Sequence, residues 1–128
     1  MADSKPALFL DRDGVINVDH GFVARVEDWA WIPGAIECVR TFNQRGWFVF
    51  VITNQSGIAF DHYSEADMDA VHAHMLAGFE AVSARIDRIY ACPFHPEGTN
   101  PRFRKDSYDR KPKPGMILQA MADFSVKR

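Results

Sequence analysis

An apolar run that ends in two closely spaced aspartates constrains this chain more than any other feature. Residues 7–17 read ALFLDRDGVIN, so the hydrophobic segment stops at Asp11 and Asp13. A run of this kind is typical of a buried strand in a parallel sheet. Ligands of open α/β sheets bind at the carboxyl ends of such strands, where both carboxylates fall. An extended backbone would put Asp11 and Asp13 on one side of the chain and Arg12 on the other.

Two carboxylates at this position can divide the chemistry of a group transfer. One can attack an electrophile while the other carries a proton, and together they can hold a hard cation such as Mg²⁺. Gly14 permits a sharp turn directly after the pair. The alternative interpretation is a strand followed by a solvated Asp-Gly turn, and an isolated Asp-x-Asp-Gly more often has that meaning.

The rest of the chain alternates strand-like and helix-like segments. We expect strands near 7–11, 47–53 and 86–91, the second of them fully buried. We expect helices near 34–45, 65–83 and 116–124, and Ser64 to Asp67 resembles a capping box. This alternation predicts an α/β fold with a parallel sheet, and 128 residues correspond to a single domain, 1–128.

Composition narrows the choice of partners. The formal net charge is −2, so no basic field favours nucleic acid. Two cysteines are too few for a disulfide framework and suit a reducing compartment. The N-terminus lacks the apolar core of a signal peptide, and no apolar run approaches membrane-spanning length. We therefore expect a cytoplasmic protein with neither nucleic-acid nor membrane partners.

Two later segments carry side chains that suit a phosphate. Residues 53–57, TNQSG, follow the second strand and could give hydrogen bonds from side chains and main-chain N–H groups. Residues 110–114, RKPKP, place a lysine between prolines just before the last helix, where it could neutralise a phosphoryl group. Taken singly, the first is equally well a polar turn, and the second is more simply a solvated basic loop.

In order and with this spacing, the segments resemble the haloacid dehalogenase (HAD) superfamily of phosphohydrolases. The motifs are DRDGVIN at 11–17, DHGF at 19–22, TNQSGIA at 53–59, CPFHP at 92–96 and RKP at 110–112. Within the superfamily they resemble the heptose-bisphosphate 7-phosphatases, and the histidinol-phosphate phosphatases share much of the pattern. The resemblance covers nearly the whole chain and implies a Rossmann-like three-layer fold.

The resemblance implies a role for each matching residue. Asp11 would be the nucleophile that forms an aspartyl-phosphate, and Asp13 the general acid and base. Asp11 and the main-chain carbonyl of Asp13 would bind Mg²⁺, and Thr53 and Lys111 would hold the phosphoryl oxygens. The expected substrate-binding residues are Asp19, His20, Gly21, Phe22, Asn54, Gln55, Ser56 and Arg110. A phosphorylated sugar would be the substrate.

The chain departs from the family at a zinc-bound loop that its members commonly carry. Cys92 is present, but Phe94, Ser107 and Asp109 stand where the family has a histidine and two cysteines. One thiolate is insufficient for a four-coordinate structural zinc site. We therefore expect no zinc, and we interpret Cys92 as a small buried hydrophobic residue.

A second departure concerns the family's fourth motif, a strand that ends in Gly-Asp and supplies further Mg²⁺ ligands. No glycine follows Gly115, so we expect a C-terminally truncated domain with about three core strands and a weakened metal site. The first strand would then be an exposed apolar edge, and we expect self-association through it unless another segment covers it.

Two functional hypotheses follow from these observations. The first is a Mg²⁺-dependent sugar-phosphate phosphatase of the heptose-bisphosphate or the histidinol-phosphate kind. The second is a weakly active or inactive remnant that binds phosphorylated ligands. Asp11, Asp13, Thr53 and Lys111 favour the first, while the missing fourth motif favours the second.

Overall fold

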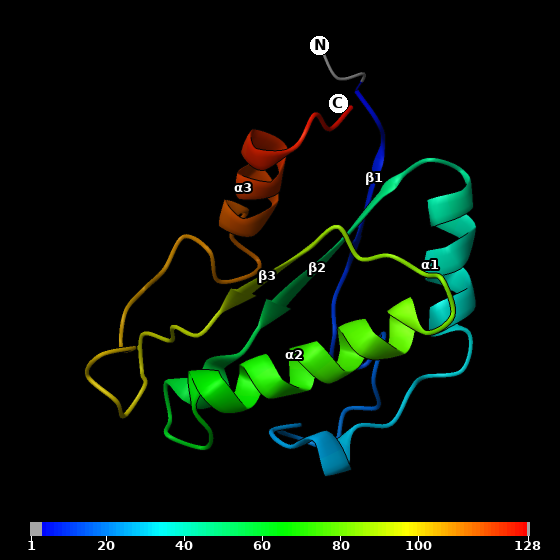
Figure 1. The fold of residues 1–128 in the computed structure, drawn as a ribbon. Helices are drawn as coiled ribbons and strands as arrows, with labels where there is room; N and C mark the ends of the chain where they lie inside the picture. Colours follow the sequence, from blue (N-terminus) through cyan, green and yellow to red (C-terminus); the bar gives the residue numbers. More distant parts are fainter. Residues whose placement is uncertain (1–3, 128) are drawn as a thin grey trace.

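A parallel three-stranded sheet forms the centre of the molecule. The computed structural model describes residues 4–127, and its strands are β1 (Ala7–Leu10), β2 (Phe48–Asn54) and β3 (Arg88–Cys92). Their spatial order is β1-β2-β3, and both pairs are parallel. The predicted α/β class with a parallel sheet is confirmed. All strands end on the same side, so the segments that follow them are neighbours (Figure 1).

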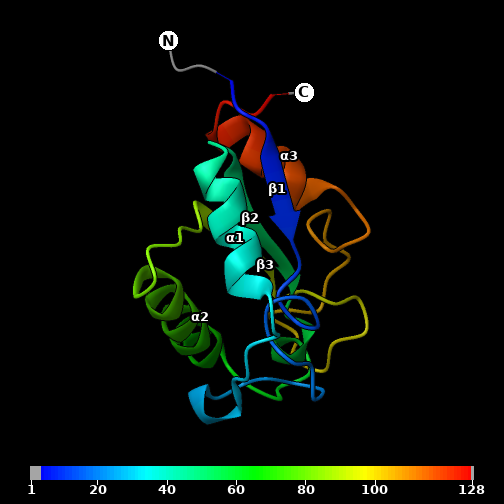
Figure 2. The same ribbon diagram turned by 90° about the vertical axis from the view of Figure 1, so that its right-hand side faces the viewer.

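Helices cover both faces of this sheet. They are α1 (Ala35–Gln44), α2 (Glu65–Glu80) and α3 (Gly115–Asp123). Figure 2 shows α1 and α2 on one side of the strands and α3 on the other. Successive side chains of a strand point to opposite faces, so Val51 packs with the α1 and α2 residues and Ile52 packs with Met116 of α3. The result is the expected three-layer arrangement.

Most of the predicted boundaries agree with the structure to within a few residues. Ser64 caps α2 in a capping box with Asp67, as its sequence predicts. The helix ends at Glu80 instead of residue 83, and Ser83 has a positive φ of 59°. β3 begins at Arg88 instead of residue 86, because the Asp87 carboxylate accepts the Val49 main-chain N–H at 2.8 Å before strand pairing starts.

β1 is less buried than its apolar sequence predicts. All four of its residues are half-buried, whereas five consecutive residues of β2 are buried. The difference arises because β1 has a strand neighbour on one side and β2 has one on each side. The first strand is therefore less buried than its apolar run predicts, and its open side agrees with the expectation of an exposed edge.

Two loops bring residues from distant parts of the sequence to the carboxyl ends of the strands. The first runs from residue 11 to 34 and includes the short helix η1 (Val26–Asp28). Gly14 turns it with a φ of 85°. The second contains η2 (Ser56–Ile58), where a side chain at Gly57 would collide with the rings of Tyr63 and Phe22. This close approach fixes η2 against the first loop.

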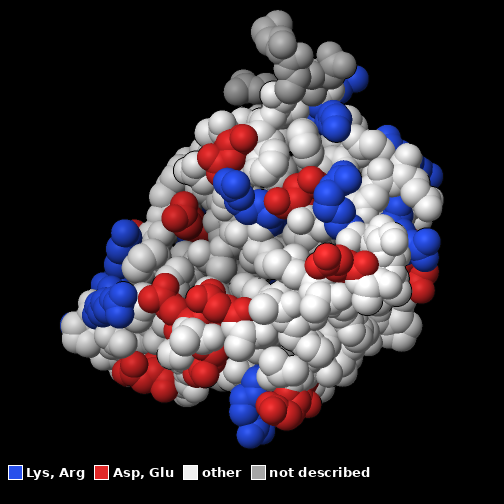
Figure 3. Space-filling view, viewed as in Figure 1, with Lys and Arg blue, Asp and Glu red and all other residues white. Residues whose placement is uncertain are grey.

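The surface carries both signs of charge. Figure 3 shows acidic and basic side chains interspersed over one face, without a continuous basic area. Among residues 4–127, no helix combines the length and apolar character needed to cross a bilayer.

Candidate active site

A cleft of about 250 Å³ lies at the carboxyl ends of β1 and β2. Asp11 and Asp13 follow β1, Asn54 ends β2, and Lys111 comes from the loop before α3. The predicted site residues that line the cleft are Asp11, Asp13, Asp19, Gly21, Phe22, Asn54, Ser56 and Lys111. The topology of the sheet therefore brings together three segments that are separated by about forty to sixty residues in the sequence.

Asp11 and Lys111 form an ion pair inside this cleft. The Lys111 Nζ lies 3.1 Å from Asp11 Oδ1, which also accepts the Arg12 main-chain N–H at 2.8 Å. The Asp11 side chain is 43% exposed and the Lys111 side chain 27%, so both remain accessible to a ligand. This arrangement places a carboxylate and a fixed cation around one point where a phosphoryl group could sit.

Asn54 sets the position of Lys111 through two main-chain hydrogen bonds. Its Oδ1 accepts the Lys111 N–H at 3.0 Å, and its Nδ2 donates to the Lys111 carbonyl at 3.2 Å. The side-chain amide thus satisfies both polar groups of one residue in a distant loop. Asn54 fastens the loop before α3 to the end of β2, a function that the sequence alone did not indicate.

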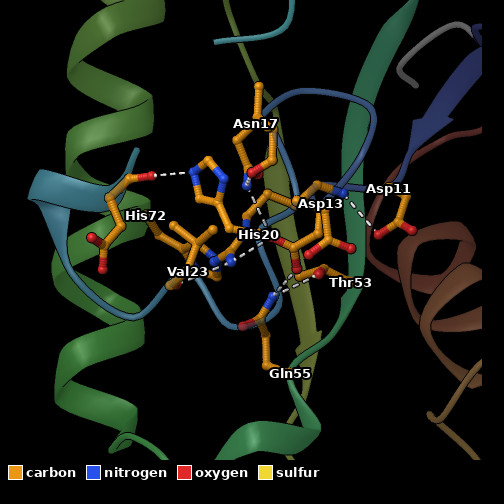
Figure 4. A network of polar contacts seen from close by, with 12 residues as sticks. Asp11, Asp13, Asn17, His20, Val23, Thr53, Gln55 and His72 are labelled. Atoms are coloured by element: carbon orange, nitrogen blue, oxygen red, sulfur yellow. Dashed lines mark hydrogen bonds and ion pairs between the residues drawn. The ribbon is translucent and has the colours of Figure 1, made fainter. Parts of the chain in front are cut away.

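Asp13 is surrounded by hydrogen-bond donors. Its Oδ1 accepts Arg12 Nη2 at 2.7 Å, Arg12 Nε at 3.1 Å and Asn17 Nδ2 at 3.0 Å. Among residues 4–127, its Oδ2 accepts only Gln55 Nε2, at 3.2 Å (Figure 4). Asp11 and Asp13 both line the cleft while Arg12 is buried behind it, as their spacing predicts, although the Arg12 guanidinium turns back onto Asp13.

Thr53 and Gln55 are buried behind the cleft instead of lining it. Thr53 is 0% exposed and Gln55 2%. Gln55 Nε2 donates to Thr53 Oγ1 at 2.8 Å, and the Tyr63 hydroxyl donates to Gln55 Oε1 at 2.6 Å. Burial raises the pKa of Tyr63 to about 12, so this donor keeps its proton at neutral pH. Figure 4 shows Gln55 reaching toward Asp13 and Thr53.

Tyr63 also lines the cleft, although no sequence motif points to it. It stands directly before the α2 cap Ser64 and outside the motifs named above. A side chain in such a place becomes a candidate only when the fold puts it beside Gln55.

The loop from Asp19 to Phe22 is held by one hydrogen bond within it and by a stacking contact with His62. Asp19 Oδ1 accepts the Gly21 N–H at 3.0 Å, and Phe22 stacks on His62 with ring centroids 4.5 Å apart. His20 Nε2 lies 3.1 Å from the Asp28 carbonyl, outside the residues that line the cleft. Arg110 also lies outside this lining, and its buried Nε has no hydrogen-bond partner among the described residues.

A larger hollow of about 520 Å³ lies next to the cleft and shares Tyr63 with it. Its lining includes Asp61, Glu65 and Arg102, and none of the predicted site residues. Arg102 forms an ion pair with Glu65 at 3.6 Å, and Asp61 accepts a hydrogen bond from Asn100 at 3.0 Å. We therefore assign the chemistry to the smaller cleft, where the two aspartates and Lys111 converge.

The cleft offers oxygen ligands that suit Mg²⁺. The Asp11 carboxylate is accessible, and the Asp13 main chain follows it at the same edge of the sheet. Within residues 4–127, no three His, Cys, Asp or Glu side chains are grouped to hold a metal. Mg²⁺ is commonly held by one or two carboxylates together with substrate phosphate and water, so this donor set fits the ion.

The positions that correspond to a zinc loop do not form a zinc site of the usual composition. Cys92 is 1% exposed and packs with Ile52 and Met116, as expected for a small hydrophobic residue. Burial raises the pKa of its thiol, which disfavours the thiolate that zinc requires. Phe94 packs against Phe103 with ring centroids 6.1 Å apart. The absence of zinc stays a prediction.

Comparisons with known proteins point in one direction. No protein-family model matches the chain. The D-glycero-β-D-manno-heptose-1,7-bisphosphate 7-phosphatase of Rhodopseudomonas palustris is 47% identical over 125 residues, which cover 98% of this chain and 69% of that protein. The protein of the same name from Escherichia coli K12 is 43% identical over 120 residues, which cover 94% of this chain and 63% of that protein. The chain thus spans about two thirds of the length of these relatives.

Solved structures agree with these sequence matches. A HAD-like phosphatase of Mesorhizobium loti superimposes with a TM-score of 0.91 at 34% identity, covering 98% of this chain and 60% of the other. The D,D-heptose 1,7-bisphosphate phosphatase of B. bronchiseptica, solved with magnesium and phosphate, has a TM-score of 0.80 at 31% identity. The match covers 93% of this chain and 64% of the other. The predicted HAD resemblance is confirmed, and these names favour the heptose-bisphosphate branch over the histidinol-phosphate one.

Proposed function

Because the chain belongs to the D-glycero-β-D-manno-heptose-1,7-bisphosphate 7-phosphatase family, we propose that it hydrolyses a phosphomonoester of a sugar phosphate, with the heptose 1,7-bisphosphate as substrate. One observation carries the proposal. Two carboxylates and a lysine, Asp11, Asp13 and Lys111, line a single cleft at the carboxyl ends of the sheet, and Lys111 Nζ lies 3.1 Å from Asp11 Oδ1.

Asp11 acts as the nucleophile in this proposal. Its carboxylate attacks phosphorus, the bond between phosphorus and the ester oxygen breaks, and the leaving oxygen takes a proton from Asp13. The product of this step is an aspartyl-phosphate and a free sugar hydroxyl. Asp13 then accepts a proton from a water molecule, which attacks phosphorus, releases inorganic phosphate and restores Asp11. Two moderate steps thus replace one difficult displacement.

Positive charge around the phosphoryl group lowers the barrier of both steps. Lys111 supplies it from a loop that Asn54 holds in place. Asp11 and the Asp13 main-chain carbonyl would hold Mg²⁺, which supplies further positive charge at the phosphoryl oxygens when it is bound. Thr53 acts on the site through Gln55 and Asp13, since its side chain is buried.

The rest of the substrate would lie against the other side of the cleft. Asp19, Gly21, Phe22 and Ser56 line it, and the 52% exposed Phe22 offers an apolar surface to a sugar carbon face. His20, Gln55 and Arg110 lie outside the lining of the cleft. Arg110 remains a candidate for the second phosphate, because it directly precedes Lys111 and its Nε has no partner among residues 4–127.

Phosphate release from the heptose 1,7-bisphosphate tests the proposal. We expect activity that requires Mg²⁺, and we expect Asp11→Asn to lower it by about 10³-fold or more, because an amide cannot form the acyl phosphate. Asp69→Asn is the matched control, since Asp69 is an exposed aspartate on α2. Equal phosphate release by Asp11→Asn and the control would refute the proposed role of Asp11.

A further inference from the structure

Arg12 is a fully buried cation directly beside the proposed acid. It is 1% exposed, and a buried charge is costly unless it is paired and hydrogen-bonded. Its guanidinium donates to Asp13 Oδ1 through two nitrogens, at 2.7 and 3.1 Å, and to the Val23 carbonyl at 3.3 Å. The remaining nitrogen, Nη1, lies 3.1 Å from His72 Nε2. The Arg12 guanidinium therefore links two parts of the first loop, Asp13 and Val23, to His72 of α2.

The contact with His72 fixes the state of that imidazole. A guanidinium has donors and no acceptor, so His72 Nε2 must be the acceptor and its proton must be on Nδ1. His72 is 7% exposed and faces Arg12 and Asp13. Burial, the larger cause, and the nearby Arg12 charge, the smaller one, lower the pKa of His72 to about 4. This value agrees with a neutral ring. The hydrogen bond thus has one possible direction at neutral pH.

The donors around Asp13 also distinguish its two oxygens. Oδ1 accepts three hydrogen bonds, two from Arg12 and one from Asn17, which leaves no room for a proton there. Oδ2 has one longer contact, 3.2 Å to Gln55. A proton on Asp13 therefore belongs on Oδ2.

We propose that Arg12 and His72 are positioning residues, in which His72 orients the Arg12 fork and the fork holds Asp13 so that Oδ2 exchanges the proton with the leaving oxygen. This inference rests on the proposed function for its catalytic meaning. Arg12 and His72 themselves contact neither the substrate nor the reacting atoms. Helix α2, which carries none of the sequence motifs, packs against two of them and thereby helps to orient Asp13.

Leaving-group dependence separates this role from a merely structural one. An alkyl phosphate needs a proton on its leaving oxygen, whereas p-nitrophenolate leaves without one. We expect His72→Leu and Arg12→Lys to slow single-turnover cleavage of an alkyl phosphate about 10- to 100-fold, with less than about a threefold effect on p-nitrophenolate release. His72→Gln retains an acceptor and should restore most of the loss. His74→Leu, at an exposed position on the same helix, is the control.

A second measurement does not depend on turnover. In protein labelled with ¹³C at aspartate carboxyls, the Asp13 resonance, assigned with Asp13→Asn, should move in His72→Leu and stay in place in His74→Leu. An unmoved Asp13 resonance, or equal losses on both phosphoesters, would overturn the positioning role while leaving the proposed function intact. A wild-type chain that releases no phosphate from the heptose 1,7-bisphosphate would instead refute the proposed function, and the resonance would still decide the positioning role. If His72→Leu does not fold, Arg12→Lys and His72→Gln provide the same comparison.

Discussion

At the scale of single residues, the site depends on side chains that hold others in place. Asn54→Ala should free the Lys111 main chain and lower kcat by about 10- to 100-fold, since a displacement near 1 Å can have this effect. The free energy of unfolding should fall by about 2 kcal/mol, because two polar groups lose their partner. Measured kcat and urea denaturation check both expectations.

Asn43 provides a matched control for that substitution. It makes the same pair of hydrogen bonds to the main chain of Arg85, at 2.7 and 3.0 Å, at the opposite end of the sheet. Asn43→Ala should therefore lower stability and leave kcat unchanged. A similar kcat loss in both variants would show that Asn54 acts through general stability and not through Lys111.

The sequence identified the residues that carry charge in the cleft, and it failed for those buried behind it. Asp11 and Asp13 were predictable because ligands bind at the carboxyl ends of parallel strands, whereas Lys111 was assigned from the resemblance to the HAD superfamily. The burial of Thr53, Gln55 and the Arg12 side chain depends on where the chain leaves its strand, and periodicity does not encode that direction. Tyr63 and His72 reach the network only through tertiary packing.

At the scale of elements, α2 makes stability depend on pH through His72. The lowered pKa, about 4 against 6.5 in the unfolded chain, means that the unfolded state takes up a proton first as the pH falls. This contribution is complete above pH 6.5, declines between 6.5 and about 4, and amounts to about 3 kcal/mol at most. Urea denaturation of the wild type and His72→Gln from pH 7 to 4 should show a shallower decline in the variant.

His74→Gln serves as the control for this measurement, since it removes an exposed imidazole from the same helix. Parallel pH profiles for the wild type and both variants would contradict the neutral, buried state of His72.

The elements themselves were largely predictable: apolar periodicity located all three long helices, and the capping box located the start of α2. The start of β3 was not, because the Asp87 side chain takes the first pairing position of Val49.

At the scale of the whole molecule, β1 has an open edge. On that edge the Lys5 N–H donates to Ser125 O at 2.9 Å, and the Lys5 carbonyl accepts the Lys127 N–H at 2.6 Å. Alternation along a strand then points the main-chain groups of Ala7 and Phe9 the same way. Within residues 4–127, no strand pairs with β1 beyond Lys5 on this side.

We propose that two copies of the chain can pair along this edge. Light scattering coupled to size exclusion should show a mass that rises with concentration. Ala7→Pro should reduce this association, since it removes an outward N–H and leaves the pairing with β2 intact. A mass of one chain at every concentration would contradict the proposal.

The central claim is that Asp11 is the nucleophile of a phosphatase, and trapping the intermediate tests it most directly. The chain is mixed with Mg²⁺ and the heptose 1,7-bisphosphate, quenched within a turnover and reduced with borohydride, which converts an aspartyl-phosphate to homoserine. Peptide mass spectrometry should find homoserine at position 11, with Asp13 unchanged. Phosphate release with an unmodified Asp11, or with the label at another residue, would contradict the account.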